Sequence, residues 1–280
     1  MSQAARAQRP SGRPPPRPGL GSTRYALHAE WTKLRTSGGT GWLLLAAITL
    51  TITVGAAAAA AVKCPSAGCG LDPAKVSLTG VDLGQAVVAI VGVLAVSSEY
   101  GTGMIRVTLA ATPRRITVLA AKTVNVAGLT LAAGAVAALG AVLAGRLILP
   151  GQGFTAAHGY QALSLADGTV LRAAAGSALY LTLIALLGVG VATAVRDSAV
   201  AIGTVLGLLY LFPILTSVVT DPHWQRHLQQ VAPMTAGLYI QATTGLHSLP
   251  LTPWQGLGVL AAWAAAALLA GALLLRLRDA

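Results

Sequence analysis

The sequence predicts an all-α integral membrane protein with six transmembrane helices, preceded by a cytoplasmic amphipathic elbow helix. Of its 280 residues, 55% are hydrophobic and only 10% are charged, which is too apolar for a soluble domain of this length. Six apolar runs are each near the roughly 20 residues needed to cross about 30 Å of hydrocarbon. The charged residues avoid these runs, so the net charge of +11 indicates an orientation in the membrane and not nucleic-acid binding.

The first 21 residues predict a disordered, basic cytoplasmic tail, separate from the membrane domain of residues 22–280. Arginines alternate with prolines in this tail, and almost no apolar side chain is available to form a core. We expect the tail to fix the orientation of the chain and to contact anionic lipid.

Residues 22–36 predict the elbow helix. Leu27, Trp31 and Leu34 are spaced i, i+4 and i+7, so they share one face, while most of the basic side chains lie on the other. A basic amphipathic helix directly before a membrane span is expected to lie in the lipid interface. The sequence Ser37-Gly38-Gly39 separates it from the first span.

The six apolar runs give the predicted spans. The third run is longer than a span and must extend beyond the hydrocarbon at one end. The runs are Gly41–Val62, Val81–Ser98, Ile116–Ile148, Ala173–Val195, Ser198–Val219 and Gln255–Leu275.

The distribution of lysine and arginine predicts that both termini are cytoplasmic, with the chain in the plasma membrane. One set of span ends carries seven of these residues in the tail and elbow, four in residues 97–122, and Arg196, Arg276 and Arg278. In total, fourteen lysines and arginines lie at this set of span ends, and five lie at the opposite set. The side of a membrane that is richer in lysine and arginine is the cytoplasmic side.

The stretch Ser97–Lys122 connects the second and third spans, and we expect it to lie in water. Glu99-Tyr100-Gly101-Thr102-Gly103 is expected to break the second span, and Met104–Ala111 to form about two helical turns. Pro113 should end these turns before the third span begins.

Two segments on the opposite side carry further signals. Cys64 and Cys69 flank a turn-forming stretch on the oxidising side, which favours a disulfide over two free thiols. After the fifth span, Trp224, Leu228 and Val231 predict an amphipathic helix that Pro233 ends, followed by a re-entrant or interfacial segment. The scattered histidines here are expected to be solvated groups, not ligands.

The polar and small residues inside the spans leave alternatives open. Asn125 is placed to form an interhelical hydrogen bond, with a role in ligand binding as the alternative. Gly203 and Gly207 have GxxxG spacing, which suits packing within the bundle, against a second copy of the chain, or both.

Two of these segments resemble the permease subunits of type-2 ATP-binding-cassette (ABC) transporters. Residues 97–122 resemble the family's cytoplasmic coupling loop, in which an acidic residue and Gly-Thr precede a short helix, a Thr-Pro-Arg stop and a lysine. Ala29–Arg35 looks like the family's elbow. The residues so assigned to the coupling loop are Glu99, Gly101, Thr102, Gly103, Met104, Ile105, Arg106, Leu109, Pro113, Arg114 and Arg115. Those assigned to the elbow are Leu27, Glu30, Trp31, Lys33 and Leu34.

The resemblance implies a permease subunit of an ATP-driven exporter that moves an unidentified amphipathic or hydrophobic substrate outward. It implies two protein partners, a separate ABC ATPase subunit and a second permease copy, identical or different. The short helix of the coupling loop would lie in a groove of the ATPase. The helices after the fifth span would cap the translocation path; without the family, the same residues form an interfacial hairpin.

Missing motifs limit the chemistry of the chain itself. It has no Gly-x-x-x-x-Gly-Lys-Ser/Thr loop for ATP hydrolysis, no His-Glu-x-x-His and no Gly-x-Ser-x-Gly. We therefore expect no enzyme activity, no cofactor and no metal site in this chain. The alternatives to a transporter are a non-transport accessory or immunity protein that binds another membrane protein, and an intramembrane enzyme without a recognisable motif.

Overall fold

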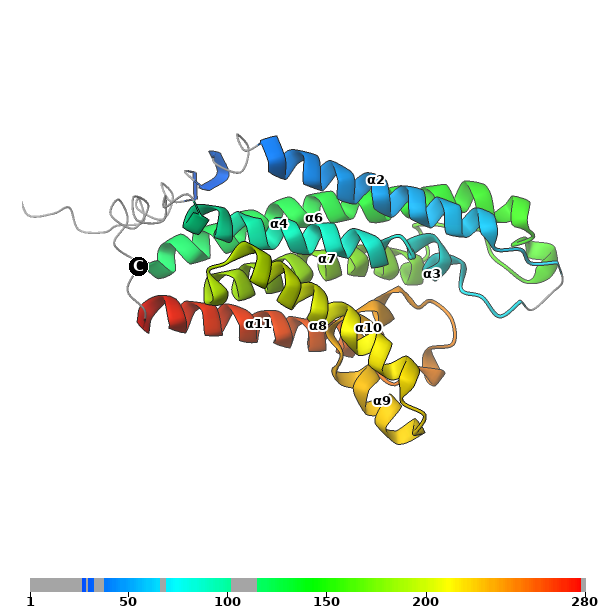
Figure 1. The fold of residues 1–280 in the computed structure, drawn as a ribbon. Coiled ribbons are helices and arrows are strands. Elements are labelled where there is room, and N and C mark those ends of the chain that lie inside the picture. Colours follow the sequence, from blue (N-terminus) through cyan, green and yellow to red (C-terminus); the bar gives the residue numbers. More distant parts are fainter. Residues whose placement is uncertain (1–26, 29, 33–37, 66–68, 102–114, 278–280) are drawn as a thin grey trace, which may run out of the picture.

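The computed structural model describes residues 27–28, 30–32, 38–65, 69–101 and 115–277. Within these ranges the secondary structure is entirely helical, with no strand (Figure 1). The predicted tail of residues 1–21 and most of the predicted coupling loop lie outside the described residues. In the predicted elbow, the described residues Leu27, His28, Glu30, Trp31 and Thr32 have a helical backbone.

Six helices are long and apolar enough to cross a membrane, as the sequence predicts. They alternate in direction along one bundle (Figure 1). The long helices are α2 (Gly38–Ala61), α4 (Val81–Gly101), α6 (Arg115–Ile148), α7 (Gly168–Val195), α8 (Ser198–Val218) and α11 (Pro253–Leu277).

Helix α7 forms the centre of the bundle, because it packs against α4, α6 and α11 and is the most buried of the six. Glycines permit its close contact with α4. A side chain at Gly92 of α4 would overlap the carbonyl oxygen of Ala185, and one at Gly188 would press on the α4 backbone at Ala89. Helices α8 and α11 lie at the edge of the bundle and leave large apolar side chains exposed, as expected for surfaces that face lipid.

We call the end of the bundle that holds Gly38, Arg115 and Leu277 the termini end, and the opposite end the disulfide end (Figure 1). The short elements lie at the disulfide end. They are α3 (Pro73–Leu78), η1 (Leu149–Gln152), η2 (Ala156–His158), α9 (Pro222–Val231), α10 (Pro233–Leu238), η3 (Tyr239–Gln241) and η4 (Leu246–Ser248).

The amphipathic helix predicted after the fifth span is α9, and it ends before Pro233 as expected. Its apolar face is not buried in the protein: Trp224 is 64% exposed and Val231 is 52% exposed. The next helix, α10, packs into the bundle between α8 and α11, with Ala236 and Gly237 buried. The segment after Pro233 therefore re-enters the bundle.

Two helices extend beyond the predicted apolar runs. Helix α4 continues past Ser98 through Tyr100 to Gly101, which lies inside the stretch Glu99–Gly103 that is predicted to break it. Helix α7 begins at Gly168, five residues before the predicted Ala173, because Asp167 caps it by accepting a hydrogen bond from the Thr169 N–H.

Candidate functional site at the termini end

A buried cluster of three charged side chains joins the N-terminal segment to the helices on both sides of the predicted coupling loop. Lys122 lies near the start of α6, Glu99 near the end of α4, and Glu30 in the segment before α2. The Nζ atom of Lys122 is 2.7 Å from Glu30 Oε2 and 3.0 Å from Glu99 Oε1. We call these residues the ion triad.

All three side chains of the ion triad are withdrawn from water. Their exposed fractions are 6% for Lys122, 4% for Glu30 and 8% for Glu99. Charges at this depth are costly to desolvate, so they remain stable only when they are paired and hydrogen-bonded. The arrangement therefore depends on the N-terminal segment lying against α4 and α6.

Asn125 provides a second tie between α6 and the N-terminal segment. It lies about one helical turn after Lys122, and its Nδ2 donates a hydrogen bond to the backbone carbonyl of Leu27 at 2.9 Å. The structure thus gives Asn125 a hydrogen-bonding partner, although the partner is the N-terminal segment and not another span. Residues 27–32 are held at two points on α6.

The start of the α7–α8 connection lies beside the same end of α4. Arg196 ends α7 with a left-handed backbone (φ 63°), and its guanidinium lies 5.5 Å from the ring centroid of Tyr100. A guanidinium at this distance from an aromatic ring is attracted to it electrostatically. Tyr100 is the neighbour of Glu99 in the sequence. This contact therefore brings the end of α7 next to the N-terminal segment, α4 and α6 at the termini end.

These positions correct the expectation that Ser97–Lys122 lies in water. Glu99 and Lys122, near the two ends of this stretch, are buried and paired with each other. Gly101 is exposed at the end of α4, Arg115 begins α6, and Trp31 is 43% exposed. The remaining predicted elbow and coupling residues lie outside the described part of the chain: Lys33, Leu34, Thr102, Gly103, Met104, Ile105, Arg106, Leu109, Pro113 and Arg114.

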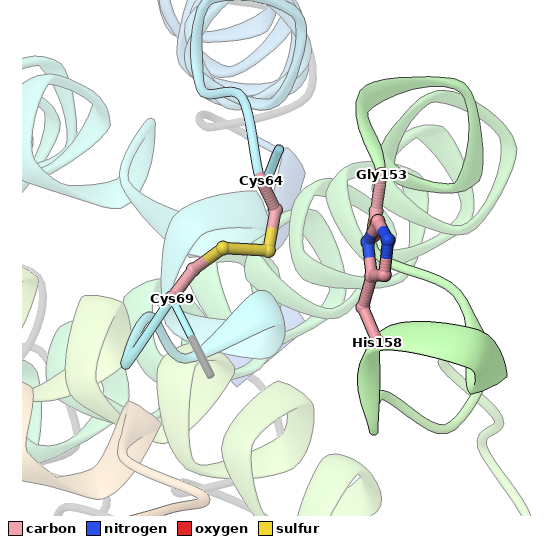
Figure 2. The surroundings of a disulfide bond; sticks show 4 residues. All are labelled: Cys64, Cys69, Gly153 and His158. Carbon is pink, nitrogen blue, oxygen red and sulfur yellow. A yellow bond between two sulfur atoms is a disulfide. The ribbon is translucent and has the colours of Figure 1, made fainter. Parts of the chain in front are cut away.

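At the disulfide end, a disulfide joins Cys64 and Cys69, whose Cα atoms are 5.7 Å apart (Figure 2). The Cys64 N–H also donates to the Gln152 carbonyl at 2.8 Å, which fixes this loop to η1. Nearby, the His158 ring approaches the Gly153 carbonyl at 2.7 Å, which holds η2 against the preceding turn (Figure 2). The disulfide loop is thus held against η1 by a backbone hydrogen bond.

Asp72 connects two loops at the disulfide end, a role that its sequence context did not reveal. Its carboxylate caps α3 by accepting from the Ala74 and Lys75 N–H groups. The same carboxylate accepts from the Thr243 hydroxyl at 2.7 Å and the Thr244 N–H at 3.0 Å. One side chain therefore joins the α2–α4 connection to the α10–α11 connection.

A polar network inside the bundle holds α10 in place. Gln85 of α4, which is fully buried, accepts a hydrogen bond from the Tyr180 hydroxyl of α7 and donates to Met234 Sδ of α10 at 3.2 Å. The Tyr210 hydroxyl of α8 donates to the Asp82 carbonyl at 2.7 Å. This network joins four helices and satisfies polar groups that would otherwise be costly inside a membrane.

Gly203 and Gly207 do not pack within the bundle. No described atom lies within 4 Å of a Cβ built at either position, whereas Gly92 and Gly188 are in tight contact. Of the alternatives that the GxxxG spacing left open, packing of these two glycines inside the bundle is therefore excluded for the described residues.

The fold defines a multi-pass, all-helical membrane protein in which Lys122, Glu30 and Glu99 form buried ion pairs at the termini end. In the described ranges no three His, Cys, Asp or Glu side chains are grouped so that they could hold a metal ion. No family model matches the chain, and no curated protein matches its sequence.

Proposed function

We propose that this chain is the permease subunit of an ATP-driven ABC exporter of the type-2 family. It resides in the plasma membrane with both termini in the cytoplasm, and it pairs with a second permease copy and a separate ATPase subunit. The substrate is an amphipathic or hydrophobic compound that moves outward. ATP is hydrolysed by the partner, because this chain has no phosphate-binding loop.

The ion triad is the observation that carries the proposal. The resemblance rests on two segments that are far apart in sequence, the elbow and the coupling loop. Lys122 pairs with Glu30 of the first segment and with Glu99 of the second. The two segments on which the resemblance rests are thus joined by buried charges.

This arrangement suggests how force could pass from a partner into the membrane. The coupling loop is bounded by α4 and α6, and the Glu99–Lys122 pair clamps the two helices together near the loop. A push on the loop would therefore move both helices as a unit. Because α4 packs closely on α7, the displacement would reach the centre of the bundle.

The proposal is tested by replacing the apolar side chains of the coupling loop while keeping every positive charge. The variant Met104→Ser, Ile105→Ser, Leu109→Ser is expected to insert normally, because the charges that set orientation are unchanged. It should no longer co-purify with an ABC ATPase from the native host. The measurement is mass spectrometry of proteins that co-elute with the tagged full-length chain.

The matched control is Met104→Leu, Ile105→Val, Leu109→Met, which keeps the loop apolar and should retain the ATPase. Co-elution of the ATPase with the triple serine variant at the parental level would contradict the coupling role of this loop. Absence of any ATPase from the parental complex would favour a non-transport accessory protein.

A further inference from the structure

Two histidines on α9 lie side by side at the disulfide end. His223 and His227 are one helical turn apart, and their ring centroids are separated by 4.5 Å with an angle of 71° between the ring planes. Both residues are exposed. The sequence alone suggested scattered, solvated histidines, and the helix brings these two onto one face.

The helix that carries the pair has a fixed start. The Asp221 carboxylate accepts from the backbone N–H groups of His223 and Trp224 at 2.8 and 3.2 Å, so it caps α9 directly at the first histidine. The backbone that presents the two imidazoles is therefore regular over the whole turn that separates them.

The ring nitrogens of the pair have no competing partner in the part of the chain that the structure describes. Neither His223 nor His227 takes part in a side-chain hydrogen bond there, whereas the His158 ring is engaged by the Gly153 carbonyl at 2.7 Å. A ring nitrogen that is not engaged by another group is able to bind a metal ion. The helix thus places two imidazole rings next to each other on one exposed face.

We propose that His223 and His227 bind a divalent late transition-metal ion on the surface of α9. Imidazole nitrogen suits Cu²⁺, Ni²⁺ and Zn²⁺, and the general order of affinity places Cu²⁺ first. Hard cations such as Ca²⁺ and Mg²⁺ require oxygen ligands and are excluded by this donor set. Two histidines at i and i+4 are also the spacing by which the His-Glu-x-x-His helix holds zinc.

The proposed site binds a metal ion but lacks the general base that metal-dependent hydrolysis requires. Trp224 occupies the position that holds the general base in the His-Glu-x-x-His helix, so no carboxylate is placed to activate a metal-bound water. The structure supplies two protein ligands, and the other coordination positions of the ion are filled by water or by a donor atom from another molecule.

The test uses the full-length chain, purified in detergent with a tag that contains no histidine. Cu²⁺ is titrated by calorimetry, and the bound ion is examined by electron paramagnetic resonance. We expect one site with two imidazole nitrogens in the copper spectrum. His223→Gln and His227→Gln should each weaken binding at least about tenfold, because each removes a direct ligand.

Two controls separate this site from non-specific binding. His247→Gln removes a histidine from the same end of the molecule and should leave the affinity unchanged. His227→Gln combined with Gln229→His keeps the number of histidines but moves one off the shared face, and it should weaken binding as much as His227→Gln alone. Wild-type affinity in His223→Gln, His227→Gln or the relocated pair would overturn the proposal.

Discussion

Lys122 contacts both other members of the ion triad. It is the partner of two buried carboxylates, so its loss would remove from both Glu30 and Glu99 the cation that they share. Breaking a buried ion pair by removing one partner costs about 3–5 kcal/mol, because the remaining charge is desolvated and uncompensated.

We therefore predict that Lys122→Met lowers the midpoint of thermal unfolding in detergent, measured by tryptophan fluorescence. Methionine keeps an unbranched side chain that is only one atom shorter, and it removes the charge. The control is Lys75→Met, because Lys75 is an exposed lysine of α3 and should tolerate the change.

A neutral version of the cluster distinguishes charge pairing from packing. Glu30→Gln, Lys122→Met and Glu99→Gln together remove all three charges, so this variant should be more stable than Lys122→Met alone. Equal stability of the two variants would show that the charges of the ion triad do not hold this end together.

Asp72 should contribute more stability than an ordinary capping residue. Asp72→Ala removes the cap of α3 and also the bonds to Thr243 and Thr244, at a cost of about 2–4 kcal/mol. Asp167→Ala is the matched comparison, because Asp167 accepts only from Thr169 and should cost about 1 kcal/mol. Equal unfolding midpoints for the two variants would contradict the role of Asp72 as a link between loops.

At the level of helices, substitution of a glycine by alanine should lower stability where the glycine packs against another helix and should not lower it where the glycine faces open space. Gly92→Ala places a methyl group on the Ala185 carbonyl and should destabilise the α4–α7 contact by about 1–3 kcal/mol. Gly203→Ala and Gly207→Ala meet open space and should leave the stability of the monomer unchanged or slightly raised. Thermal unfolding of each variant at low protein concentration measures this difference, and similar losses in all three would refute it.

The long helices could be predicted from sequence because each is an apolar run of spanning length, and α9 because its apolar residues recur with helical spacing. The short helices α3 and α10 carry no such period, since each has six residues. Their positions depend on tertiary contacts, such as the capping of α3 by Asp72 and the burial of Gly237 against Tyr180.

The candidate site could be predicted only in parts. Glu99 stands out as an acidic residue directly after the second apolar run, Asn125 as a polar residue inside the third, and Lys122 as the base of the third span. Glu30 stands out only as part of the predicted elbow. Their mutual distances depend on how the N-terminal segment folds back on α6, which no local pattern encodes. The same is true of Gln85 and Tyr180, whose pairing follows from the contact of α4 with α7.

For the whole molecule, the distribution of charge predicts which end faces the cytoplasm. In a background with Cys64 and Cys69 replaced by serine, cysteines at Gly159 and Ser248 should react with a membrane-impermeant thiol reagent added to intact cells. A cysteine at Thr112 should be protected until the membrane is permeabilised. Labelling of Thr112 from outside would reverse the orientation.

The ion triad also constrains how the chain is synthesised and inserted. Its members occur at positions 30, 99 and 122, so Glu30 leaves the ribosome before the first span and Lys122 only as the third span begins. Until then, neither carboxylate can pair with Lys122, although burial of a carboxylate becomes less costly when a cation pairs with it. The bridge from the N-terminal segment through Lys122 to α4 can therefore form only after the first two spans have been synthesised and the third has begun.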